Sequence, residues 1–167
     1  MNLSNSDNKV GGGQIKALVL DVDGTLTDGR IYIGNNGEIM KAFWAHDAVG
    51  VRQLVKNGII PIIITGRESN IVKIRASEMN IEHVYMNVED KKSKLIEVTN
   101  ELGLSLDEIA FIGDDINDLD AMKMCRIAVC PKNAMGEVKE ISDYVSKYDG
   151  GHGAVRELCE YLLKLET

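Results

Sequence analysis

The chain has 167 residues, of which 44% are hydrophobic and 27% charged, values typical of one globular domain. Asp and Glu outnumber Lys and Arg by 26 to 19, and the resulting net charge of -7 argues against binding nucleic acid or an anionic membrane through a broad basic surface. An anionic ligand would need positive charge supplied locally.

The three cysteines, Cys125, Cys130 and Cys159, lack CxxC spacing and lie within apolar patterns. They are typical of reduced core residues in a cytoplasmic protein, and zinc is the weaker interpretation. No stretch has the length of a membrane span, and the N-terminus has no apolar signal region. We expect a disordered tail at residues 1–14 and one domain at residues 15–167.

Short apolar runs then alternate with helical patterns. Strands are expected at residues 16–20, 59–64, 83–86, 109–112 and 127–129, and each run is nearly continuous, as in parallel strands covered on both faces. Helices are expected at residues 47–56, 69–79, 91–102 and 154–165, with Gly58 and Gly103 as left-handed residues after two of them. The alternation predicts an α/β, doubly wound, Rossmann-like parallel sheet, with ligands at the carboxyl ends of its strands.

One segment, RIYIGNNGEIMKAFWAHD at residues 30–47, breaks the alternation. It predicts a protruding β-hairpin over about residues 30–43, turning at Asn36–Gly37 in a type I′ turn. Apolar residues fall in both phases of its strands, so both faces are apolar, and an isolated hairpin is marginally stable in water. We expect one face to rest on its own domain and the other on a second subunit. The alternative is that both faces fold back onto the parent core.

Acidic residues follow the first strand in the stretch LVLDVDGTLTDG, residues 18–29. Placing Asp21 and Asp23 at the end of a buried strand costs several kcal/mol, roughly, unless a positive charge meets them. Further polar clusters follow later strands or open a helix: Thr65 and Gly66, then Lys91, then Asp114, Asp115 and Asp118. Each cluster alone is explained by helix capping or by solvated surface charge.

Taken together, these clusters have complementary chemistry. Asp21, Asp23 and Asp114 offer the hard oxygen ligands that Mg²⁺ prefers, while the Thr65 hydroxyl, the Gly66 amide and Lys91 can donate to a phosphate. Two like charges about 4 Å apart repel by about 4 kcal/mol at an effective dielectric constant of 20, so a phosphate beside these carboxylates requires a cation. The set therefore predicts a Mg²⁺-dependent phosphate site.

The segments DVDGT, ITGR, the lysine of EDKK and GDDIND resemble, in order, the four motifs of the haloacid dehalogenase (HAD) superfamily of phosphohydrolases, over about residues 16–165. The resemblance implies that Asp21 is the nucleophile that forms an aspartyl phosphate. It implies that Asp23 is the general acid and then the general base. Thr65 and Lys91 would hold the transferring phosphoryl oxygens. Lys94 is the alternative lysine, but Lys91 fits the motif spacing better.

The same resemblance implies the metal ligands. They are Asp21, the backbone carbonyl of Asp23, and Asp114, with Asp115 or Asp118 in outer positions. Residues 24–64 and 66–90 are filled by the hairpin and by single helices and strands, which leaves no room for a cap domain. A capless enzyme would close its site with the hairpin and a neighbouring chain.

The segments DGRIYIGNNGEIMKAF, TGRESNIVKIRASEMNI and GGHGAVRE closely resemble phosphatases of 3-deoxy-D-manno-octulosonate 8-phosphate (KDO 8-phosphate). This resemblance implies a homotetramer joined through its hairpins, a small anionic sugar phosphate as substrate and a product used for lipopolysaccharide. The candidate substrate-binding residues are Gly66, Arg67, Arg75 and His152. An arginine suits a sugar-acid carboxylate; alternatively, Arg67 and Arg75 merely pair with surface acids.

Three residues, Trp44, His46 and His152, depart from what is usual in the octulosonate enzymes, which leaves the sugar open. A phosphatase of a nine-carbon acylneuraminate or KDN 9-phosphate is one alternative. Another is a non-catalytic oligomerisation module like the C-terminal domain of acylneuraminate cytidylyltransferases. A phospho-accepting receiver domain uses similar residues, but in a different motif order.

Overall fold

A six-stranded sheet lies at the centre of the computed structural model, which describes residues 14–165. Its strands are β1 (Ala17–Leu20), β4 (Ile60–Ile64), β5 (His83–Tyr85), β6 (Ile109–Ile112), β7 (Ile127–Cys130) and β8 (Tyr144–Val145). They pair in parallel in the order β5-β4-β1-β6-β7-β8. The chain runs from β1 to one side of the sheet and later returns to β6 on the other, which places the topological switch point at β1. The predicted doubly wound fold is confirmed.

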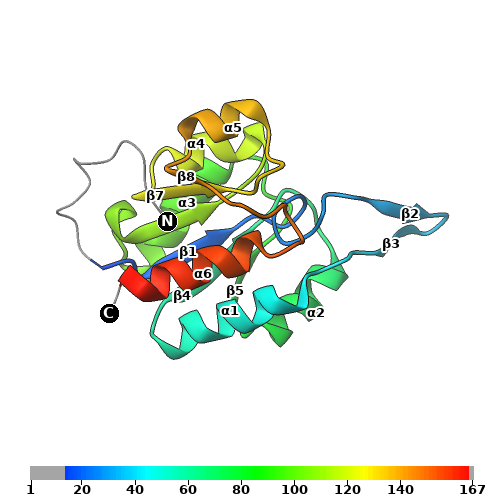
Figure 1. The fold of residues 1–167 in the computed structure, drawn as a ribbon. Coiled ribbons are helices and arrows are strands. Elements are labelled where there is room, and N and C mark those ends of the chain that lie inside the picture. The colour runs from blue at the N-terminus through cyan, green and yellow to red at the C-terminus, as the bar shows by residue number, and fades with distance from the viewer. Residues whose placement is uncertain (1–13, 166–167) are drawn as a thin grey trace.

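Helices cover both faces of the sheet (Figure 1). The helices α1 (Ala45–Lys56), α2 (Asn70–Glu78) and α6 (Ala154–Leu165) contribute to one hydrophobic core. The opposite core takes residues from α3 (Lys91–Leu102), α4 (Leu119–Met122) and α5 (Gly136–Ile141). Strand β1 contributes Leu18 and Leu20 to the first core and Ala17 and Val19 to the second. This two-sided burial explains the continuous apolar runs of the sequence.

The sequence analysis missed several short elements. These are β8, α4, α5 and two 3-10 helices, η1 (Leu106–Glu108) and η2 (Ile116–Asp118). Segments this short do not repeat an apolar pattern often enough to show a period. Gly58 and Gly103 have φ angles of 80° and 65°, as predicted, and all three cysteines are buried.

Within residues 14–165, the hairpin and α1 are the only elements between β1 and β4, and α2 is the only one between β4 and β5. The predicted absence of a cap between these strands therefore holds for this part of the chain. No helix in the same range is long and apolar enough to cross a bilayer. The predicted tail at residues 1–14 lies outside the described residues except for Gln14.

The hairpin consists of β2 (Tyr32–Gly34) and β3 (Gly37–Met40), which form a separate antiparallel sheet. The predicted type I′ turn at Asn36–Gly37 is wrong. Gly34 pairs with Gly37, so Asn35 and Asn36 form the loop, and Gly37, with φ of 106°, is the left-handed residue. A glycine after the two turn residues supplies the positive φ that asparagines would otherwise have to adopt.

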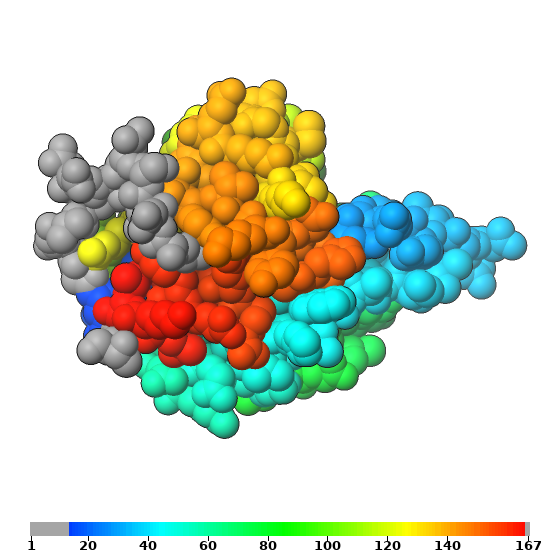
Figure 2. All heavy atoms as spheres, viewed as in Figure 1, coloured from blue at the N-terminus to red at the C-terminus, as the bar shows by residue number. Residues whose placement is uncertain are grey.

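The hairpin projects from the body of the molecule as a narrow arm (Figure 2). Ile33 is 68% exposed and Ile39 is 61% exposed, and Ile31 and Met40 are exposed as well. The alternative in which both hairpin faces pack on the parent core is therefore wrong. The arm therefore carries an uncovered apolar surface, of the kind that often marks an interface.

Candidate active site

The carboxyl ends of β1, β4 and β6 bring the predicted functional loops to one rim of the sheet. Asp21 follows β1 directly, Thr65 follows β4, and Asp114 lies two residues beyond β6. The loops remain tied to the sheet, because the Asp21 amide donates to the carbonyl of Ile112 (3.1 Å) and the Thr65 amide to that of Tyr85 (3.0 Å). Residues far apart in the sequence thus reach one site through strand order.

Lys91 is the first residue of α3, and its side chain is only 1% exposed. Its ammonium nitrogen lies 2.7 Å from Oδ1 of Asp21 and 2.6 Å from Oδ1 of Asp118. Burial alone would lower the pKa of Lys91, but the charges of the two aspartates outweigh it and raise this pKa. The alternative, Lys94, is partly exposed and pairs with Glu97. The structure therefore favours Lys91 as the lysine of the site.

Asp21, Asp114 and Asp118 form a cluster in which one carboxylate oxygen of each lies within 4.8 Å of the others. Burial, followed by the negative charge of Asp118, raises the pKa of Asp21 well above its usual range, although Lys91 opposes the shift. Burial and Asp118 also raise the pKa of Asp114 to about 6, against a hydrogen-bonding interaction with Asp21 and a hydrogen bond from the Thr25 hydroxyl. A divalent cation would relieve this repulsion, and the oxygen donors suit Mg²⁺.

Asp118 is completely buried and holds the site together. Besides Lys91, it accepts hydrogen bonds through Oδ2 from the amides of Asp114 (3.0 Å) and Asp115 (3.3 Å). Asp115 instead accepts from the Ile116 amide and caps η2, which is the helix-capping explanation considered for it above. Of the two aspartates proposed for outer positions, Asp118 is therefore the one that belongs to the cluster.

Two glycines let the loops of the site approach closely. Gly24 has φ of 93°, and a Cβ atom there would lie 2.0 Å from Oδ2 of Asp114, while Thr25 donates to Oδ1 of the same aspartate. A Cβ atom on Gly150 would lie 1.7 Å from the carbonyl oxygen of Gly24. The backbone of the GGHG segment thus packs against that of the DGT segment, which in turn packs against the Asp114 side chain.

The carboxylate of Asp23 has two cationic neighbours. Lys41, whose side chain is 1% exposed, lies 2.5 Å from Oδ1, and Arg67, whose side chain is 51% exposed, places Nε 3.9 Å from Oδ2. The sequence analysis missed Lys41, because a lysine in a protruding strand carries no signal of burial. The Asp23 side chain is not part of the acidic cluster, and the role of its carbonyl as a metal ligand stays a prediction.

The remaining substrate-binding candidates are spread more widely. The guanidinium of Arg75 donates to the Trp44 carbonyl (3.0 Å), pairs with Glu78 (3.1 Å) and lies over the Phe43 ring, at the base of the hairpin. His152 is exposed, with its ring centroid 5.8 Å from that of Trp44. These contacts hold Arg75 and His152 beside the hairpin base, whereas Gly66 follows Thr65 at the rim. Their contribution to binding stays a prediction.

Known proteins are similar to this chain in sequence and in fold. A family model described as haloacid dehalogenase-like hydrolase matches residues 68–158. The KDO 8-phosphate phosphatase KdsC of Escherichia coli K12 is 38% identical over 149 residues, which are 89% of this chain and 79% of that protein. The site geometry and this similarity point to the same class of protein.

Two solved structures extend the comparison. The KDO 8-phosphate phosphatase of Moraxella catarrhalis, in complex with magnesium, phosphate and KDO, is 41% identical with a TM-score of 0.87, over 90% of this chain and 86% of that chain. The cobalt-bound deoxy-D-mannose-octulosonate 8-phosphate phosphatase of Haemophilus influenzae is 32% identical with a TM-score of 0.88, over 90% of this chain and 88% of that chain. Both similarities span nearly the whole described fold.

Proposed function

We propose that this chain, which belongs to the haloacid dehalogenase-like hydrolases, hydrolyses KDO 8-phosphate to KDO and inorganic phosphate. That it is a phosphoric monoester hydrolase follows from its similarity to such phosphatases over 89% of its length. The observation that carries the proposal is the buried contact of Lys91 with Asp21 and Asp118 beside Asp114. This arrangement supplies a carboxylate nucleophile, a cation for phosphoryl oxygens and a metal site in one place.

Mg²⁺ is the proposed cofactor, held by Asp21, Asp114 and the backbone carbonyl of Asp23. When bound, it supplies the positive charge that lets a phosphate approach these carboxylates. Support comes from the raised pKa values of Asp21 and Asp114, since carboxylates that repel one another gain most from a divalent cation. The magnesium in the Moraxella catarrhalis structure is consistent with this choice.

In the first chemical step, a carboxylate oxygen of Asp21 attacks phosphorus and the bond to the ester oxygen breaks. The protonated carboxyl of Asp23 gives its proton to that departing oxygen, so the product leaves as an alcohol. Lys91, the Thr65 hydroxyl and the Gly66 amide hold the oxygens of the transferring group, where negative charge is spread. The enzyme then carries an aspartyl phosphate at residue 21 and a carboxylate at residue 23.

In the second step, the carboxylate of Asp23 accepts a proton from a water molecule as the water oxygen attacks phosphorus. The bond between phosphorus and Asp21 breaks, so Asp21 returns as a carboxylate and inorganic phosphate leaves. Asp23 ends protonated and ready for the next ester. The two halves balance: one ester and one water become one alcohol and one phosphate.

The sugar-acid part of the substrate would be recognised mainly by Arg67. Its side chain is exposed next to Asp23, so its guanidinium can reach a carboxylate on the leaving group. Arg75 and His152 are proposed as further contacts, presented from the hairpin base or across a subunit boundary. A nine-carbon sugar acid phosphate remains the second candidate, because Trp44 and His46 alter the rim where the sugar would lie.

We further propose a cytoplasmic homotetramer assembled through the hairpins, with a product used in lipopolysaccharide precursor synthesis. The exposed Ile33 and Ile39 support the assembly, since this apolar surface is uncovered in one chain. A purely structural module is disfavoured, because Asp21, Asp23, Thr65, Lys91 and Asp114 are all present.

The direct test is phosphate release with Mg²⁺ on a panel of eight- and nine-carbon sugar acid phosphates and p-nitrophenyl phosphate. We expect the highest kcat/KM on KDO 8-phosphate, and Asp21→Asn should fold normally but lose activity by about 10³-fold or more. Asp107→Asn, at an exposed aspartate of η1, is the matched control and should behave as wild type. A phosphoryl group trapped at residue 21 by acid quenching and mass spectrometry would support the intermediate. Wild-type turnover by Asp21→Asn would remove Asp21 as nucleophile, and no turnover of any ester by the wild type would leave the structural module standing.

A further inference from the structure

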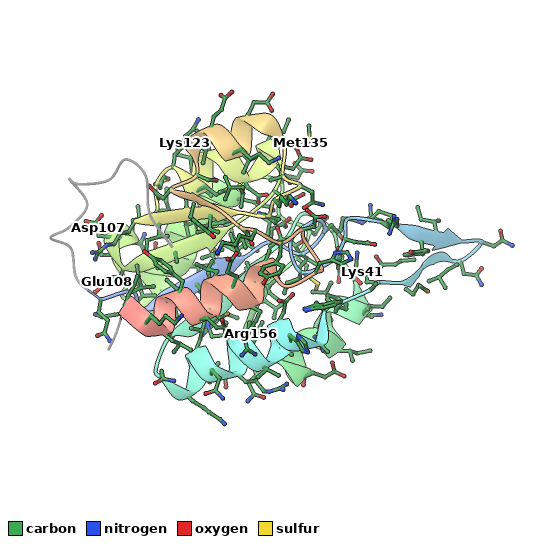
Figure 3. All side chains as sticks on the ribbon, in the orientation of Figure 1. Lys41, Asp107, Glu108, Lys123, Met135 and Arg156 are labelled. Carbon is green, nitrogen blue, oxygen red and sulfur yellow. The ribbon has the colours of Figure 1, made fainter. Side chains whose placement is uncertain are left out.

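The side chain of Lys41 is buried, although most neighbouring residues of the hairpin are exposed or half-exposed. It follows β3 at the base of the hairpin (Figure 3), where the arm joins the body. Ile39, two residues earlier, is 61% exposed, yet the Lys41 side chain is only 1% exposed. Burying an ammonium group is costly unless it is paired, so the partners of Lys41 explain its position.

Those partners are two carboxylates. The Lys41 nitrogen lies 2.5 Å from Oδ1 of Asp23 and 2.8 Å from Oε1 of Glu38. A lysine ammonium group has donors only and no acceptor, so these two short contacts fix where each carboxylate lies.

The contacts continue from Glu38 to the loop after β4. The Ser69 hydroxyl donates to Oε2 of Glu38 and also accepts from the Val72 amide, as the N-cap of α2. Ser69 lies four residues after Thr65. A continuous polar chain thus runs from Asp23 through Lys41 and Glu38 to Ser69, and it joins the loops after β1 and β4 at the hairpin base.

We propose that Lys41 is a positioning residue for the proton transfers of Asp23, an inference that rests on the proposed function. Lys41 holds Oδ1, which leaves Oδ2 of Asp23 to give a proton to the ester oxygen and later to take one from water. An unanchored carboxylate rotates about its side-chain bonds, and proton transfer is efficient only when donor and acceptor are held in place. The hairpin base thereby sets the geometry of the general acid.

The leaving group provides the test, because kcat/KM reports the steps up to departure of the alcohol. A sugar alkoxide needs a proton to leave, whereas p-nitrophenolate leaves readily without one. Lys41→Met should therefore lower kcat/KM on KDO 8-phosphate by about 10²-fold and on p-nitrophenyl phosphate by less than about threefold. Lys123→Met, at an exposed lysine beside α4 (Figure 3), is the matched control and should change neither value.

A double-mutant cycle separates positioning from a general structural effect. In an Asp23→Asn background, Lys41→Met should lower kcat/KM on KDO 8-phosphate by less than about threefold further, because its target is gone. Equal losses on both esters, or a full additional loss in the Asp23→Asn background, would overturn the proposal. If circular dichroism shows that Lys41→Met does not fold, Lys41→Arg replaces it. This variant should also lose more kcat/KM on KDO 8-phosphate than on p-nitrophenyl phosphate. A wild-type protein inactive on both esters would instead overturn the proposed function, and with it this inference.

Discussion

The ammonium nitrogen of Lys91 lies 2.7 Å from Oδ1 of Asp21, and both side chains are almost completely buried. This contact joins the first turn of α3 to the end of β1, two segments 70 residues apart. The positive charge of Lys91 offsets only part of the negative charge of Asp21, Asp118 and Asp114, so the pKa of Asp21 stays raised.

Lys91→Met tests how much the positive charge of Lys91 contributes to stability and to activity. Removing the ammonium leaves Asp21 and Asp118 buried without their cation, so we expect the free energy of unfolding at neutral pH to fall by about 3 kcal/mol or more. Activity should fall by at least about 10²-fold. Lys94→Met removes the partly exposed neighbour that pairs with Glu97 and should change stability by less than about 1 kcal/mol. Urea unfolding and phosphate release measure both variants, and a larger effect at Lys94 would reverse the assignment.

The contribution of Asp114 to the stability of the Mg²⁺-free protein should fall as pH rises from about 4 to about 7. The pKa of Asp114 is 3.8 in the reference state and about 6 in the folded protein, so the folded state binds more protons within this window. Because protons compete with Mg²⁺ for the carboxylates, Mg²⁺ should raise Tm by several degrees more at pH 7.5 than at pH 4.5. Thermal unfolding with and without Mg²⁺ at the two pH values measures the difference.

Asp47 provides the control for that experiment. Burial raises its pKa to about 6 as well, but its Oδ1 accepts from the Arg156 amide, away from the acidic cluster. Asp47→Asn should weaken the pH dependence of the Mg²⁺-free protein and leave the extra Mg²⁺ stabilisation at pH 7.5 intact. Asp114→Asn should abolish that extra stabilisation, and an unchanged Mg²⁺ effect in this variant would exclude Asp114 as a ligand.

Arg67→Ala should reveal how the sugar acid is recognised. If the guanidinium binds the substrate carboxylate, KM on KDO 8-phosphate should rise by about 10-fold or more, while kcat/KM on p-nitrophenyl phosphate changes by less than about threefold. Arg52→Ala is the control, because Arg52 lies on α1 and donates to the Glu78 carbonyl. Equal effects of the two substitutions on KDO 8-phosphate would argue that Arg67 is only a partner for Asp23.

The hairpin interface is tested by replacing its exposed apolar residues with charges. The double substitution Ile33→Asp and Ile39→Asp should convert the proposed tetramer to smaller species, because like charges would face one another across the proposed apolar contact. Ile96→Asp, at an exposed isoleucine of α3, should leave the mass unchanged. Light scattering gives the molar mass, and a monomeric wild type would contradict the proposed assembly.

Much of the fold and site could be predicted from local sequence. The apolar runs and helical spacing located the long elements, since parallel strands and packed helices impose their own periods. Asp21, Thr65, Lys91 and Asp114 could be proposed as site residues because each lies at a strand end or helix start, where parallel topology gathers side chains. The turn at Asn36–Gly37 was misplaced by one residue, because GNNG permits more than one hairpin register and the pairing of Gly34 with Gly37 selects one.

The sequence alone therefore determined which chemical groups converge, since periodicity and strand order are local properties of the chain. Tertiary structure decided which of them touch: Asp118 contacts Lys91, Asp115 caps η2, and Lys41 turns inward to Asp23. The reason is physical. A charged side chain is buried only where partners from other segments offset the cost of its desolvation. The local sequence around that residue does not show where those partners will lie.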